Sequence, residues 1–64
     1  MHTDADINAV AAVLIRIYGS GAEAEAARKV NEKRESGDRD AEEAWIRIWD
    51  RIAQADLASG STAA

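Results

Sequence analysis

The stretch that decides the fold runs from Gly37 to Ala55 and reads GDRDAEEAWIRIWDRIAQA. A glycine such as Gly37 ends a helix in the left-handed conformation, and an aspartate such as Asp38 caps the helix that follows. Beyond it, apolar residues recur at intervals of three and four, as on a helix with one buried face: Ala41, Ala44, Trp45, Ile48, Trp49, Ile52 and Ala55. This spacing predicts a helix from about Arg39 to Ala58.

The segment before Gly37 predicts a second helix, over about residues 21–36. Ser20 and Glu23 stand at the spacing of a capping box, and the residues that follow are mostly Ala, Glu, Lys and Arg, which favour helices. Its buried side is thin, since it consists of small residues: Ala22, Ala26, Ala27 and Val30. Such residues let helices approach closely but bring little apolar area.

A further helix is predicted at the start of the chain, over about residues 4–18. Thr3 is the expected N-cap, and Asp6 stands three residues later, where a capping-box acid is placed. At about 100° per residue, one face of this helix collects the apolar residues expected in the core: Ile7, Val10, Ala11, Leu14, Ile17 and Tyr18. We expect Trp45 to be largely buried against this helix, near Leu14 and Tyr18.

These segments predict an all-α fold, a small three-helix bundle with tight Gly-Ser and Gly-Asp turns. Gly19 before Ser20 and Gly37 before Asp38 each read as a helix stop followed by a helix start. Turns of about two residues make neighbouring helices fold back on one another. The expected organisation is one domain over residues 1–58 and a disordered tail over 59–64, because the tail residues are small and polar.

Composition narrows the function classes. The chain has 64 residues, no cysteine and a net charge of −4, so disulfides cannot reinforce its small core. Net acidity disfavours nucleic acid and anionic membranes as partners. The apolar run from Ala9 to Ile15 is far shorter than the ~20 residues of a membrane span. The acidic N-terminus differs from the basic opening of a signal peptide, and we expect a cytoplasmic protein.

No catalytic, cofactor or metal site is expected. The four serines, Ser20, Ser36, Ser59 and Ser61, fall at a cap, a helix end or the tail, where no base is placed to activate them. His2 is expected to be a solvated terminal residue. Adjacent Glu42 and Glu43 project about 100° apart and suit the positive end of a helix dipole better than a shared site. The sequence shows no small-molecule substrate, and we expect a protein that is not an enzyme.

Taken together, the chain resembles a family of short, uncharacterised bacterial proteins, mostly proteobacterial, that form a domain of unknown function. The resemblance covers about residues 4–54, and its residues are Leu14-Ile15, Tyr18-Gly19, Gly37-Asp38, Trp45-Ile46-Arg47-Ile48 and Ile52, with the alanine-spaced helix between them. The second tryptophan, Trp49, departs from the family pattern. The resemblance implies a compact helical fold and provides no activity to transfer.

The most informative feature is a surplus of large apolar residues. Several lie off the centre of their own helix stripe, and one three-helix copy has little with which to cover them: Val13, Ile15, Ile46, Trp49 and Leu57. We therefore expect an interaction module that forms a homodimer or binds another helical protein through these residues. The alternative is a small DNA-associated regulator of helix-turn-helix type. Against it, the expected recognition helix opens with Asp38, Asp40, Glu42 and Glu43, which repel phosphates.

Overall fold

A computed structural model describes the backbone of residues 3–63 and the side-chain environments of residues 3–57. Within that part of the chain the fold is all-helical and has no strand. The α-helices are α1 (Asp4–Tyr18), α2 (Ala22–Ser36) and α3 (Arg39–Ala63), and a short 3₁₀ turn, η1 (Gly19–Gly21), joins the first two. None of the described helices combines the length and the apolarity that crossing a membrane requires.

The start of α1 confirms the predicted capping box. The Thr3 hydroxyl accepts a hydrogen bond from the Asp6 backbone N–H at 3.2 Å, and Asp6 accepts one in return from the Thr3 N–H at 3.5 Å. Two of the amide groups that a helix leaves unpaired at its N-terminus are thereby satisfied.

The turn between α1 and α2 differs from the prediction. Gly19 has the positive φ expected of a stop signal, 56°. However, Ser20 lies inside η1, the N-cap of α2 is Gly21, and no side chain caps that helix. The predicted Ser20 cap is therefore wrong. The 3₁₀ turn adds residues between the two helices and moves the serine away from the cap position.

The turn between α2 and α3 confirms the prediction in detail. Gly37 is left-handed, with φ 79°, and its N–H donates to the Arg34 carbonyl at 3.2 Å. The next N–H, that of Asp38, donates to the Lys33 carbonyl at 3.1 Å, which closes the end of α2. The Asp38 carboxylate then accepts from the Ala41 N–H at 3.1 Å and caps α3.

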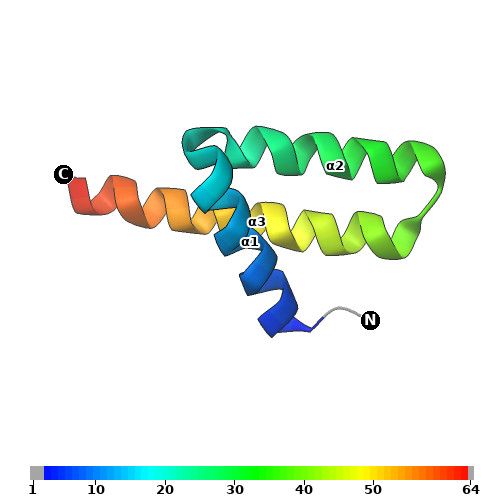
Figure 1. Ribbon diagram of the computed structural model, residues 1–64, viewed down its shortest axis with the longest axis horizontal. Coiled ribbons are helices and arrows are strands. Elements are labelled where there is room, and N and C mark those ends of the chain that lie inside the picture. The colour runs from blue at the N-terminus through cyan, green and yellow to red at the C-terminus, as the bar shows by residue number, and fades with distance from the viewer. Residues whose placement is uncertain (1–2, 64) are drawn as a thin grey trace.

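The last helix is longer than expected. The structure continues α3 to Ala63, whereas the sequence predicted an end at Ala58 and a disordered tail over 59–64. No proline interrupts this segment, and one glycine in a helix costs only about 1 kcal/mol, so the backbone pattern can propagate. The final turns of α3 extend past the start of α2 (Figure 1). Ala64, like Met1 and His2, lies outside the described residues.

The helices form a compact but uneven arrangement. α2 and α3 run antiparallel along most of the length of α2, and α1 crosses α3 obliquely near the start of α2 (Figure 1). α2 and α3 have the most extensive contact, whereas α1 and α2 touch little. The molecule measures 41 × 21 × 18 Å, and the 25 residues of α3, about 37 Å long, account for its greatest dimension.

The core is small and rich in alanine. Its buried members come from all three helices: Ile7, Ala11, Leu14, Ala22, Ala26, Ala44, Ile48 and Ile52, with Trp45 packed against them. Trp45 is only partly buried, so the expectation of a largely buried indole is corrected. Val10, Ile17 and Tyr18, expected in the core, are exposed. Because α1 crosses α3 obliquely and touches α2 little, its buried residues are confined to the strip Ile7, Ala11 and Leu14.

Candidate interaction surface

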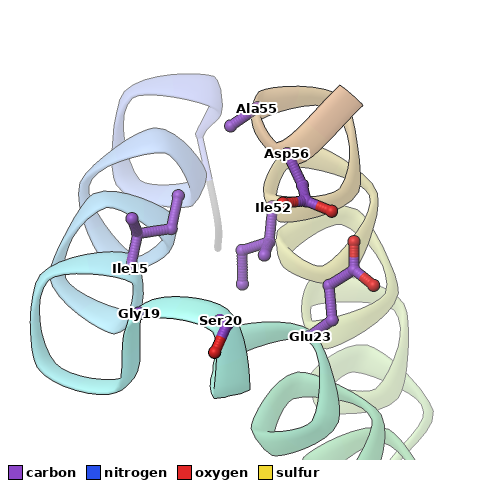
Figure 2. A pocket seen from close by; sticks show the side chains of 7 residues that line it. All are labelled: Ile15, Gly19, Ser20, Glu23, Ile52, Ala55 and Asp56. Carbon is purple, nitrogen blue, oxygen red and sulfur yellow. The ribbon is translucent and has the colours of Figure 1, made fainter. Parts of the chain in front are cut away.

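Two hollows in the described residues lie beside α1. One of about 250 Å³ is lined by Ile15, Gly19, Ser20, Glu23, Ile52, Ala55 and Asp56. Figure 2 shows Ile15 on one side and the Glu23 and Asp56 carboxylates on the other. The volume is below the ~300 Å³ at which small-molecule pockets begin. Its only hydroxyl is that of Ser20, and the residues that line it include no histidine, lysine or cysteine.

A second, more open hollow of about 360 Å³ continues along the same side of α1. It shares Ile15 and Ala55 with the first, and its polar residues are Asn8, Arg51 and Gln54. Among the described residues no group of three or more His, Cys, Asp or Glu side chains is placed to hold a metal ion. The two hollows offer a shallow apolar strip with a mixed polar border and no arrangement of a nucleophile with a base.

The ionic groups of α2 form pairs along its surface. Arg28 contacts both Glu25 and Glu32, and Lys29 lies 3.9 Å from Glu32. The hydrogen bond from Arg28 lowers the pKa of Glu25, and the same contact raises the pKa of Arg28. Arg28 and Glu32 are about half exposed, whereas Glu25 and Lys29 are partly covered, and ion pairs that solvent reaches contribute little stability. They mark a solvent face and not a reactive site.

The basic cluster at the end of α2 also has partners. The Arg34 Nε donates to the Glu42 carboxylate at 2.9 Å and so links α2 to the first turns of α3. Lys33 and Arg34 lie in the last turn of α2, where basic side chains complement the negative end of the helix dipole. The structure gives Arg34 this second function as a bridge between helices.

The five residues predicted to bind a partner are all exposed: Val13, Ile15, Ile46, Trp49 and Leu57. However, they do not share one surface. Val13 and Ile15 are two positions apart on α1, so their side chains project about 160° from each other. Ile15 lines the hollows beside α3, and Val13 points to the other flank of α1.

The three residues on α3 do lie together. Ile46, Trp49 and Leu57 fall within an arc of about 80° on the helix, and the half-buried Ala53 lies inside that arc. Ile46 projects about 160° from Ile48, which is in the core. We call these four residues the outer face of α3. Trp49 is 39% exposed, Ile46 43% and Leu57 71%.

The structure reveals a second apolar strip that the sequence reasoning missed. Val10, Val13 and Ile17 share one flank of α1, and Ile17 is 65% exposed. Val10 and Ile17 were assigned to the core because they fall near its stripe on the helical wheel. The sequence did contain a signal for this exposure. The apolar arc of α1 is wide, whereas α2 supplies only alanines and one valine to cover it.

No protein-family model, no curated protein and no solved structure matches the chain. The resemblance to a bacterial domain of unknown function therefore stays an expectation. The surface itself must support any function assigned to the chain.

Proposed function

We propose that this chain is a small three-helix domain without enzymatic activity, and that it binds another helical protein or a second copy of itself through the outer face of α3. The observation that supports this most is the grouping of Ile46, Trp49 and Leu57 on the side of α3 turned away from the core. Scattered exposed apolar residues are ordinary on a monomer, whereas a contiguous set that includes tryptophan is typical of a binding surface.

The composition of the core supports the same proposal. Four of its eight buried members are alanines, and no large side chain among residues 3–57 is completely buried. In contrast, eight large hydrophobic residues of the described chain are exposed. Burying these side chains against a partner contributes a free energy of about 25 cal/mol for each Å² of apolar surface removed from water. Binding a partner supplies the burial that the three helices do not provide for one another.

The total surface of the molecule is larger than that of a typical monomer of the same mass. Its accessible area is 4632 Å², whereas a compact monomer of 6.9 kDa exposes about 4,000 Å². In addition to the side that packs on α1 and α2, α3 has a second apolar side, the outer face, which is suited to lie against another helix.

Trp49 is the expected centre of the binding energy. Tryptophan is the residue type most enriched among binding hot spots, and Ile46 and Leu57 extend the apolar contact along α3. Charged residues border it: Glu42, Arg47, Asp50 and Asp56. An apolar centre with a polar rim is the usual anatomy of a protein interface.

The experiment is a capture of partners from the native cell with the wild-type chain and two variants. Trp49→Glu places a charge on the outer face of α3, and Val13→Glu makes a comparable change at an exposed site on α1. A protein that binds the wild type and Val13→Glu but is lost with Trp49→Glu supports the proposal. Circular dichroism first verifies that both variants keep the parental melting temperature, and Ile46→Glu repeats the test at a second position.

The proposal fails if the wild type captures nothing specific and also does not associate with itself. It also fails if every partner binds all the variants equally, because the outer face of α3 is then not used.

A further inference from the structure

We infer that the partner of the outer face of α3 is a second copy of the chain, bound antiparallel about a two-fold axis beside Ile48 and Trp49. This inference rests on the proposed function and names the occupant of that surface. It follows from the middle of α3, where the positions of Ile46, Trp49 and Ala53 and of the charged pair Arg47 and Asp50 complement themselves when the helix is reversed.

The apolar residues interdigitate in this arrangement. With the axis at that height, Ile46 of each copy falls between Trp49 and Ala53 of the other, and the two Trp49 side chains meet beside the axis. A large residue thus packs over a small one, as knobs fill holes between paired helices. A two-fold interface of this kind uses the same patch on both copies and is the commonest way for small proteins to associate.

The charges give the register and the direction. Asp50 and Arg47 lie about 40° and 100° round from Ile46, on one border of the outer face. When the helices are antiparallel, like borders meet, so Arg47 of each copy lies opposite Asp50 of the other. Two equivalent ion pairs result. In the described part of the chain Arg47 has no ion-pair partner, and Asp50 accepts a hydrogen bond from Gln54 at 2.9 Å.

The charges on the Trp49 side of the outer face also permit the antiparallel arrangement. On that side the carboxylate of Asp56 from the second copy approaches that of Glu42, and two carboxylates alone would repel each other. Glu42 is already neutralised by Arg34, whose side chain is 62% exposed and is therefore accessible to a second carboxylate. In a parallel, in-register pair, Arg47 would lie at the same height as Arg47 of the other copy, and Asp50 at the same height as the other Asp50. Neither of the two Arg47–Asp50 ion pairs would then form.

The size of the face predicts a weak dimer. From Ile46 to Leu57 it is about 17 Å long and about 10 Å wide. That footprint is far below the ~800 Å² per partner of a standard stable interface. We therefore expect a reversible dimer with a dissociation constant in the high-micromolar range, which weakens as salt screens the border charges.

The test is sedimentation equilibrium of two charge reversals, alone and mixed. Arg47→Asp brings two aspartates together at each contact, and Asp50→Arg brings two arginines together. Each variant alone should dimerise at least about tenfold more weakly than the wild type. An equimolar mixture should recover the wild-type association, because every contact then joins an arginine to an aspartate. Trp49→Glu should abolish association, and Val13→Glu should leave it unchanged.

The inference is overturned if the wild type stays monomeric at millimolar concentration, if the mixture recovers nothing, or if Val13→Glu dissociates the dimer and Trp49→Glu does not. Failure of the proposed function is distinguishable. A monomeric chain that still captures another protein through Trp49 contradicts only the second-copy partner. A dimer that survives both charge reversals contradicts only the antiparallel pairing.

Discussion

Replacing Ile48 by alanine removes one of the two large side chains that α3 buries in the core. Ile48 is 4% exposed and packs in the cluster that joins all three helices. The change deletes three carbon atoms, worth about 0.8 kcal/mol each, and the cavity adds to that while the better helix propensity of alanine offsets a few tenths. We expect a loss of about 2–4 kcal/mol, comparable with the whole stability of so small a domain.

The matched control is Ile46→Ala, the same change two positions away on the outer face of α3. Ile46 is 43% exposed and lies outside the core cluster, so its loss should cost about 1 kcal/mol or less. The assay is thermal and urea denaturation followed by circular dichroism at low micromolar concentration, where the proposed weak dimer is dissociated. The melting temperature should fall by roughly 10–25 °C for Ile48→Ala and by a few degrees for the control. Equal losses at the two positions would refute the assignment of core and outer face.

Three further outcomes follow from the turns and the charge of the molecule. Gly37→Ala should cost about 1–2 kcal/mol, because its φ is 79°. In contrast, Gly21→Ala should stay within about 0.5 kcal/mol of the parent, since its φ is −88° and an added Cβ meets only ordinary contacts; equal denaturation midpoints would contradict this. Asp38→Ala should lose about 1 kcal/mol of capping energy while Ser20→Ala changes little, because only the first caps a helix; a reversed order in the same assay would be inconsistent with the structure. A titration with random duplex DNA at low salt should show no binding by the acidic chain, and steeply salt-dependent binding would instead support the DNA-associated alternative.

The local parts of the fold were predictable from the sequence. The Thr3 capping box and the Gly37–Asp38 turn depend on residues within a few positions of one another, and both are as expected. The Ser20 cap failed for a reason that is also local, because a 3₁₀ turn competes closely in energy with a direct helix start. The predicted end of the last helix at Ala58 differs from the structure because Ser59-Gly60-Ser61 is only a weak signal for ending a helix.

The arrangement of the helices was less predictable. The period of one helix shows which residues could face a core, but not which will be covered. Val10 and Ile17 are exposed because α1 crosses α3 obliquely, and that angle depends on how three helices pack together. Similarly, the excess of apolar residues was evident from the sequence, whereas the separation of Val13 and Ile15 from Ile46, Trp49 and Leu57 required the placement of the helices in space.

The most direct test of association is the solvent exposure of Trp49 as a function of protein concentration. A Trp45→Phe variant leaves Trp49 as the single tryptophan, so that acrylamide quenching reports on the outer face of α3 alone. If two copies bury that face, the quenching constant should fall severalfold between low-micromolar and millimolar protein, and the emission should shift to the blue. The fall should be lost with Asp50→Arg and recovered when Arg47→Asp is added in equal amount. A quenching constant that stays the same over that range would contradict the burial of Trp49 between two copies.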